Sequence, residues 1–172
     1  MLSKLKACVQ QFLSERPHKA GETVQFGWFW FRIVEAGSPP EIETLDMKGM
    51  ASFTTDFHEA ERVHQEQCRM VTANGVEADD SITLMHSALV SKNYRPGVSD
   101  AFLKHDEPSG GIDSGWYVGI YDDPLDMDDP DSFHRQSLYE LTIHDMRMAR
   151  YWTLPQAFLV HLDTSVVDDL RE

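Results

Sequence analysis

One short segment, residues 22–34 (ETVQFGWFWFRIV), restricts the fold more than any other part of this chain. Side chains of a strand point alternately to its two faces. Alternation here places apolar groups on both faces: Val24, Phe26, Trp28 and Trp30 on one, and Phe29, Phe31 and Ile33 on the other. A strand of this kind needs cover on both sides. We therefore expect a single central strand with its aromatic rings in the core. If one face stays exposed, it offers a docking patch for a second copy, as in a homodimer.

The strongest helical signal covers residues 56–72. Asp56 and Glu59 have the spacing of a capping box, and Asn74 with Gly75 form a typical stop signal. Apolar residues also recur with helical spacing over residues 2–15, ahead of a proline. We expect a helix in both places.

The rest of the chain predicts short strands joined by loops. Residues 93–111 are expected to be mostly loop. The expected strands are 41–47 and 50–53, which form a hairpin, then 87–90, 116–121, 137–143 and 156–162, with a short helix over 145–152. Helices and strands do not alternate regularly, which indicates an α+β fold with a mixed, mainly antiparallel sheet and a few packing helices.

The polar, acidic residues 76–80 are the best candidate for an internal boundary. They divide the chain into an N-terminal α+β region, residues 1–80, and a second domain, residues 81–172. A chain of 172 residues builds one ordinary domain or two small ones. We expect the two regions to pack together as one compact unit.

Charge narrows the choice of partner. The chain has 15 Lys and Arg against 29 Asp and Glu, a formal charge of −14. Nucleic acids and anionic membranes attract cationic surfaces, so both are disfavoured as partners. No apolar run approaches the length of a membrane span, and the first residues lack the apolar core of a signal peptide. We expect a cytoplasmic protein that attracts basic partners.

An ordered set of motifs in the second half resembles a known family. Its most specific element is Asp113-Ser-Gly-Trp116. The other landmarks, in order, are residues 88–92, 128–131, 138–141 and 154–158. Over residues 87–162 the chain resembles the immunity-protein-33 domain of bacterial polymorphic toxin systems, formerly a domain of unknown function. It departs from the family pattern at residues 104–107, where members often have an Arg-Glu pair, and at Gln156-Ala157, where a Gly is common. The resemblance implies a protein that binds and silences a cognate toxin, without catalytic residues or a cofactor.

The acidic stretch after residue 121 is the first candidate for partner binding. It holds six aspartates: Asp122, Asp123, Asp126, Asp128, Asp129 and Asp131. The missing central glycine and the proline argue against a calcium loop of the EF-hand type. A merely solvated loop is one interpretation, and docking against a cationic surface is the other. A neighbouring loop adds Asp106, Glu107 and Asp113 to the predicted contact surface.

The Asp113–Trp116 motif also has a structural interpretation. Asp113 and Ser114 suit a turn, Gly115 suits a positive φ, and Trp116 suits the core where a strand begins. Direct contact with a partner is the alternative. A nucleophile elbow needs glycine two residues before and two after the serine, and Ser114 has neither.

Two alternatives to an immunity protein remain open. The helix at 56–72 carries His58, Glu61, His64 and Cys68, which would suit a small metal-dependent hydrolase. No zinc-binding His-Glu-x-x-His motif is present, and the Glu-x-x-His spacing is not repeated. We therefore expect neither metal nor cofactor. The other alternative is a general protein-interaction module that has no toxin partner.

Overall fold

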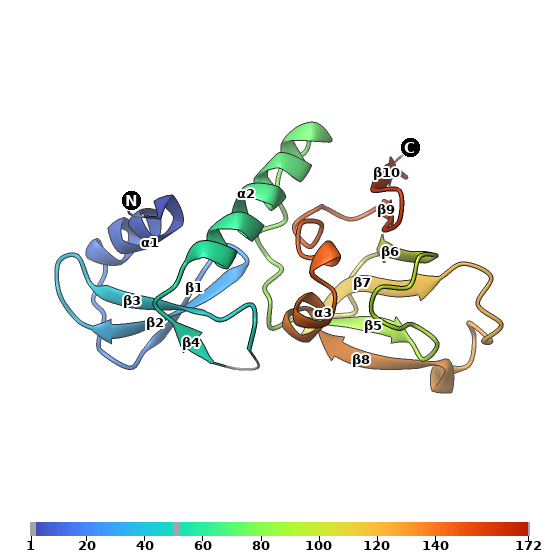
Figure 1. Cartoon of the computed structure of the whole chain (residues 1–172), viewed down its shortest axis with the longest axis horizontal. Coiled ribbons are helices and arrows are strands. Elements are labelled where there is room, and N and C mark those ends of the chain that lie inside the picture. The colour runs from blue at the N-terminus through green and yellow to red at the C-terminus, as the bar shows by residue number, and fades with distance from the viewer. Residues whose placement is uncertain (1–2, 50–51, 172) are drawn as a thin grey trace.

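The computed structural model describes residues 3–49 and 52–171. It is an α+β fold with two mostly antiparallel sheets (Figure 1). The first half consists of α1 (Lys4–Ser14), β1 (Thr23–Phe26), β2 (Phe29–Glu35), β3 (Glu41–Leu45), β4 (Phe53–Thr54) and α2 (His58–Ala73). Its strands form a four-stranded antiparallel sheet in the order β1-β2-β3-β4. The expected fold class and the helix near the N-terminus are confirmed.

The expected single strand over residues 22–34 is wrong, because this segment is a tight hairpin. Phe26 pairs with Phe29, and Gly27 and Trp28 form the two-residue loop. Gly27 has a φ of 55°, which suits the first position of a type II′ hairpin turn. The prediction of a core position for most of the aromatic rings is confirmed, since Trp28, Phe29 and Phe31 are buried.

The helix predicted at residues 56–72 is confirmed as α2, but its capping box does not form. The helix begins at His58, and Asp56 accepts a hydrogen bond from the His58 amide (2.9 Å). Glu59 pairs instead with Arg62 one turn later. The ring of Phe57 is buried and stacks on that of Phe31, so tertiary packing and not a side-chain cap sets the start of the helix.

Two further predictions, the stop signal after α2 and a hairpin within residues 41–53, are confirmed, although the described strands are Glu41–Leu45 and Phe53–Thr54. Gly75 has a φ of 64° just after α2, as the stop signal predicts. The predicted hairpin over 41–53 exists, with Leu45 opposite Phe53. Met50 and Ala51, which the prediction placed in its second strand, lie outside the described residues.

The second half forms a six-stranded sheet in the order β10-β9-β6-β7-β5-β8, in which β5 and β7 are parallel. Its elements are β5 (Ser87–Ser91), β6 (Ala101–His105), β7 (Asp113–Ile120), a 3-10 turn η1 (Pro130–Ser132), β8 (Phe133–Ser137), α3 (Leu138–His144), a 3-10 turn η2 (Met146–Met148), β9 (Phe158–His161) and β10 (Val166–Asp169). The expected strands over 87–90, 116–121 and 156–162 are confirmed as β5, β7 and β9.

Residues 93–111 are mostly loop, as predicted, but they also contain the strand β6, which was not predicted. Two predictions for this half are wrong. The first is the strand over 137–143, where the chain forms α3. Ser137 and Glu140 make a complete capping box, which favours helix over the strand-like alternation of apolar residues. Residues 145–152 form one 3-10 turn, η2, followed by further turns, in place of the expected short helix.

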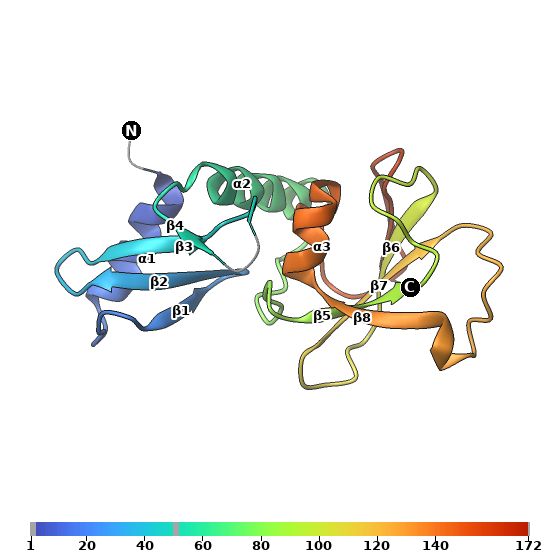
Figure 2. The same cartoon turned by 60° about the horizontal axis from the view of Figure 1, so that its bottom comes forward.

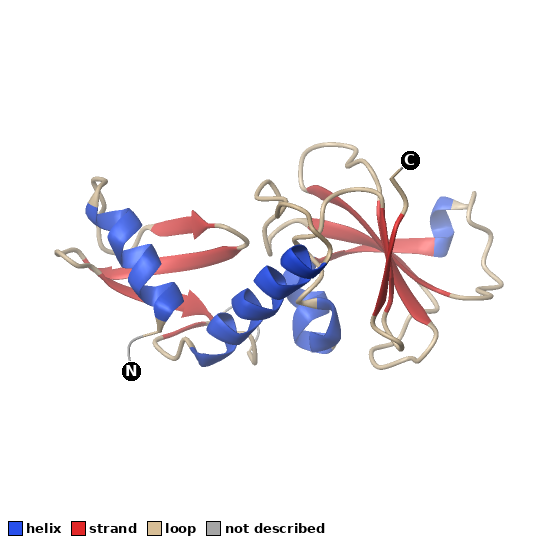
Figure 3. Ribbon diagram, turned by 90° about the horizontal axis from the view of Figure 1, so that it is seen from above, coloured by secondary structure: helices blue, strands red, loops and turns tan. Residues whose placement is uncertain are grey.

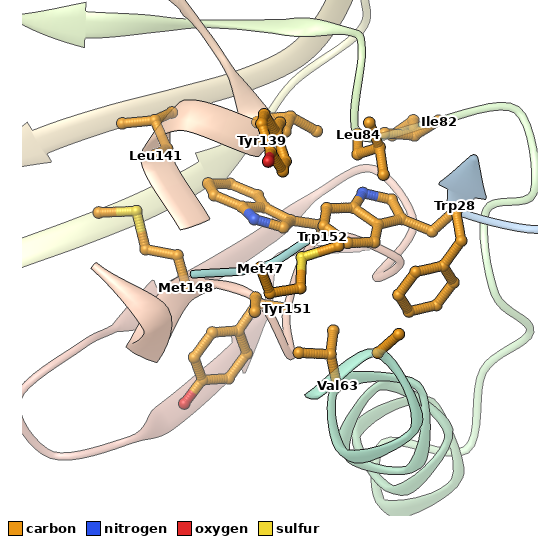
Figure 4. Packing of buried hydrophobic residues seen from close by; sticks show 14 of the residues in the cluster. Trp28, Met47, Val63, Ile82, Leu84, Tyr139, Leu141, Met148, Tyr151 and Trp152 are labelled. Carbon is orange, nitrogen blue, oxygen red and sulfur yellow. The ribbon is translucent and has the colours of Figure 1, made fainter. Parts of the chain in front are cut away.

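A continuous cluster of buried hydrophobic side chains includes residues from both sheets. Figure 4 shows Trp28 and Leu84 packed near Trp152. The Leu84 amide donates to the Trp28 carbonyl oxygen (3.0 Å), and Gln67 Nε2 of α2 donates to the Ala149 carbonyl oxygen (2.9 Å). Helix α2 reaches from the first sheet to the vicinity of α3 (Figure 3). Within the described residues, no helix has the length and apolar character needed to cross a membrane.

Candidate partner-binding site

The Asp113 carboxylate closes the loop between β6 and β7. It accepts hydrogen bonds from the Ser109 amide (2.8 Å) and hydroxyl (2.5 Å), and from the Gly115 amide (3.3 Å). Arg135 of β8 donates to the same carboxylate at 3.1 Å. The aspartate thus joins the loop to two strands of the sheet.

In the middle of the Asp113–Trp116 motif, the backbone of Gly115 lies very close to the backbone of Asp106. Gly115 has a φ of 78°, and a Cβ atom at this position would lie 2.2 Å from the Asp106 carbonyl oxygen. Ser114 is buried; its hydroxyl donates to the Ser87 carbonyl oxygen (2.9 Å) and accepts from the Trp116 amide (3.1 Å). The positive φ predicted for Gly115 is confirmed.

Trp116 is the fourth residue of β7 and does not lie at the start of a strand as predicted. Its indole is buried and donates from Nε1 to the Trp152 carbonyl oxygen (3.2 Å). The His105 ring stacks on it with centroids 4.4 Å apart. The nitrogens of His105 lie 2.9 Å and 3.0 Å from the carbonyl oxygens of Leu154 and Ser114. The core position predicted for Trp116 is confirmed, and direct partner contact by the motif stays a prediction.

The hydrogen bonds of Asp113 have an electrostatic consequence. Burial alone would raise the pKa of this carboxyl, but the donors on Ser109, Arg135 and Gly115 outweigh burial and hold the pKa at about 2. A carboxyl whose pKa is depressed by folding stabilises the native state above its unfolded pKa, and that contribution disappears as the pH falls through the folded pKa.

Asp113→Asn should therefore remove a stabilisation of about 2 kcal/mol at neutral pH and flatten the loss of stability between about pH 4 and pH 2. Urea unfolding at several pH values measures both effects. Asp100→Asn is a matched control, since the Asp100 side chain is exposed. If Asp113→Asn loses as much stability as the wild type between about pH 4 and pH 2, the low pKa of Asp113 is contradicted.

The other predicted contacts near this motif lie at the surface. Asp106 and Glu107 are exposed, and Asp106 pairs with Lys104 at 2.9 Å. Both follow β6 directly, beside the loop that Asp113 closes. The structure therefore brings Asp106, Glu107 and Asp113 to one loop of the sheet, with Asp113 already engaged within the chain.

The aspartate-rich loop, residues 122–131, connects β7 to η1. Asp123 is half-buried and the other five aspartates are exposed, which confirms that the loop faces solvent. Asp126 accepts from the Asp128 amide (2.9 Å), and Asp129 accepts from the Asp131 amide (2.9 Å). The loop is thus shaped by its own short-range turns.

Asp123 attaches this loop to the sheet. Its carboxylate accepts from the Ser91 hydroxyl, from Asn93 Nδ2 (2.8 Å) and from the Leu125 amide (3.1 Å). Burial raises the pKa of Asp123, but these hydrogen bonds outweigh it and lower the pKa below its ordinary value. Across residues 3–49 and 52–171, no lysine, arginine or histidine forms an ion pair with any of the six aspartates. The loop therefore displays fixed carboxylates without internal neutralisation.

The candidate metal ligands on α2 are not brought together. Glu61 accepts from the Leu5 amide (2.8 Å) and the Ser3 hydroxyl at the start of α1. His64 lies 3.8 Å from Cys68 Sγ, and burial lowers the pKa of His64. No group of three or more His, Cys, Asp or Glu within the described residues is placed to hold a metal ion. An open hollow of about 700 Å³ beside the start of α2 includes His58 and Glu61 in its lining, together with Lys4, Lys6 and Arg62.

Sequence reasoning missed one polar arrangement that the sheet creates. Tyr121 Oη lies 2.7 Å from His161 Nδ1, and His161 Nε2 lies 2.8 Å from an Asp168 carboxylate oxygen. These residues come from the end of β7, β9 and β10. Since β10 was not predicted, no spacing in the sequence could have revealed the chain of contacts.

No family model, no curated protein and no solved structure matches this chain. The resemblance to immunity-protein-33 domains therefore stays a prediction that rests on the sequence motifs alone.

Proposed function

We propose that this chain is a cytoplasmic immunity protein that binds one bacterial toxin and blocks its active site without turnover. The observation that carries the proposal is the aspartate-rich loop, which presents carboxylates in a shape held by its own turns. A preformed loop loses little conformational entropy on binding, and unneutralised charge speeds encounter with a basic surface.

The positions of the resemblance motifs support the same proposal. Asp113–Trp116 lies in a central strand, and residues 128–131 belong to the loop that leaves that strand on the way to β8. The buried part of the motif would hold the scaffold, while the exposed loop would vary with the toxin that it meets. In this proposal the Asp113–Trp116 motif stabilises the sheet, and the aspartate-rich loop contacts the toxin.

The mechanism follows from the charge of the loop. A toxin that cuts nucleic acid would line its active site with arginine and lysine to hold phosphate. Carboxylates of the aspartate-rich loop would occupy those phosphate positions and exclude the substrate. Ion pairs of this kind at an interface can have large coupling energies.

The direct test is binding to the product of the adjacent gene, because an immunity gene normally lies beside that of its toxin. A catalytically disabled form of that product should bind the full chain one to one with nanomolar affinity in titration calorimetry. Absence of binding would contradict the proposal.

Asp126→Asn, Asp128→Asn and Asp129→Asn combined should slow association with the toxin about tenfold and flatten its dependence on salt. Asparagine keeps the side-chain oxygen that accepts the loop hydrogen bonds, so the melting temperature should change little. Stopped-flow association at several salt concentrations measures the effect.

The matched control makes the same change in charge on the first sheet and just after α2. Glu35→Gln, Glu41→Gln and Glu77→Gln alter exposed residues outside the proposed contact surface. If both triple variants slow association equally, net charge and not the aspartate-rich loop is responsible.

The two alternatives have simple tests. Stoichiometric zinc, iron or manganese in the purified protein would favour a metal-dependent hydrolase that uses His58 and Glu61, which line the hollow beside α2. A gene neighbourhood without a toxin would favour a general interaction module.

A further inference from the structure

The six-stranded sheet has two unlike faces. One face packs on the core, where Leu103, Val118 and Val160 are fully buried. Helix α3 lies on that side of the sheet (Figure 2). Trp152 links the two, since it packs edge to face on Trp116 and donates from Nε1 to Thr142 of α3. The side chains that alternate with these residues point to the opposite face. Several of these side chains, among them Phe102, Tyr117 and His161, are only partly buried.

The opposite face carries a continuous group of rings, which we call the aromatic face. Phe102 lies opposite Gly119 on one side and His161 on the other. The ring of Phe102 is 4.8 Å from that of Tyr121 and 5.6 Å from that of Tyr117. The group consists of Phe102, Tyr117, Tyr121, Phe133 and His161, from the strands β6 to β9 and the residue that follows β7.

Gly119 makes room for this group. A Cβ atom at Gly119 would lie 2.5 Å from the Phe102 ring and 2.7 Å from the Tyr117 ring. The absence of a side chain there lets both rings lie over β7 and pack against each other. The aromatic face is therefore a built surface, with Tyr121 39 % exposed at one end.

Carboxylates border these rings. Burial and the charge of Asp123 raise the pKa of Tyr117, and burial and the charge of Asp168 raise the pKa of Tyr121. Asp168 also contacts His161. Met127 of the aspartate-rich loop is 57 % exposed and lies 3.7 Å from Tyr117 Oη, so the loop adjoins the aromatic face.

The cations on this side of the sheet are already paired. Lys104 binds Asp106 at 2.9 Å, and Arg135 binds Asp113 at 3.1 Å. The rings and their border thus combine partly exposed π-systems with the carboxylate of Asp123, which forms no ion pair within the described residues, and with that of Asp168, whose ion-pair partner is the imidazole of His161. This combination favours a cationic partner over a neutral or an acidic one.

We propose that the aromatic face binds an arginine-bearing basic segment of a partner protein. A guanidinium can stack on a ring and at the same time donate paired hydrogen bonds to a carboxylate. A second copy of the chain would bring its own acidic border against this one, and an uncharged apolar partner would leave the carboxylates desolvated and unpaired. The proposal deepens the proposed function and rests on it only for the identity of the partner as a toxin.

The test is an NMR titration of the full chain with a capped hexa-arginine peptide, with a capped hexa-citrulline peptide as the neutral control of nearly the same shape. Only hexa-arginine should shift the ring signals of Phe102, Tyr117 and Tyr121 and the Met127 methyl signal. Shifts confined to the amides of the aspartate-rich loop would overturn the proposal, as would equal shifts with hexa-citrulline. Ring shifts that depend on protein concentration without peptide would instead indicate a second copy as the occupant, and would also overturn it.

Tyr117→Leu keeps much of the apolar area and removes the π-face. It should weaken hexa-arginine binding about two- to fivefold, the range expected for an exposed cation–π contact. Phe26→Leu makes an equivalent change on the first sheet and should not alter binding. Equal binding by wild type and Tyr117→Leu would contradict the proposal. The wild-type titration decides the matter on its own if the variant does not fold.

This test and the toxin-binding test can fail separately. If the toxin binds while the peptide avoids the rings, the immunity function stands and the aromatic face is excluded from it. If the peptide binds the rings and the adjacent gene product does not bind, the aromatic face is confirmed as a basic-segment site and the toxin assignment is lost.

Discussion

Gly115→Ala should lower the free energy of unfolding by more than about 4 kcal/mol, a loss that few single substitutions reach. The new Cβ atom would meet the Asp106 carbonyl oxygen at 2.2 Å, which is far inside van der Waals contact. Backbone atoms cannot rotate aside as the end of a side chain can. The loop between β6 and β7 would have to open, and the Asp113 hydrogen bonds would be lost with it. Urea unfolding followed by tryptophan fluorescence measures the change.

Gly75→Ala separates the clash from the cost of the backbone conformation. Gly75 also has a positive φ, 64°, but nothing lies within 4 Å of the position of its Cβ atom. Alanine there should cost only the left-handed conformation, about 1–2 kcal/mol. Equal losses in the two variants would show that the close approach at Gly115 does not exist in solution.

Trp116→Ala should cost about 3–5 kcal/mol of unfolding free energy. The indole is only 1 % exposed, and its removal leaves a cavity between His105 and Trp152. It also leaves the Trp152 carbonyl oxygen without its donor. Trp116→Phe, which keeps a ring in the stack, should lose less than Trp116→Ala. An alanine variant that melts like the wild type would show that the ring is peripheral.

Together these variants test whether the Asp113–Trp116 motif is scaffold or contact. If it is scaffold, toxin affinity measured on the folded fraction should stay near wild type in Trp116→Phe. A large loss of affinity without loss of stability would assign the motif to the interface instead.

The features that the sequence predicts well are those set by local chemistry. The helix over 56–72 ends where Asn74 and Gly75 predict, and the exposure of residues 122–131 follows from their charge. The hairpin at 23–35 was missed because only one of its two loop residues, Gly27, favours a turn, and it stands inside an unbroken run of strand-forming residues. The strand predicted at 137–143 was wrong because the prediction followed the alternation of apolar residues. In the protein the Ser137–Glu140 capping box forms instead, and it starts a helix.

In the candidate site, too, the features that could be predicted are those that depend on neighbouring residues in the sequence. Clustering along the chain was enough to indicate the acidic loop, and the turn chemistry of Asp113 and Gly115 could be anticipated from residue type. The aromatic face could not, because its rings come from strands that become neighbours only through long-range pairing. His105 could not be assigned to the core for another reason: a histidine is buried there only because two backbone carbonyl oxygens face its ring nitrogens.

The contacts between the two sheets limit how this protein can be dissected. A truncated fragment that begins at residue 81 would lack Trp28, whose carbonyl oxygen accepts from the Leu84 amide, and Gln67, which donates to Ala149. It would also lack Asp46, whose carbonyl oxygen accepts from Tyr139 Oη (2.5 Å). Such a fragment would expose the apolar side chains that normally meet across the two sheets, and its failure to bind a toxin would say nothing about where the toxin binds. Mapping therefore has to proceed by point substitution in the whole chain.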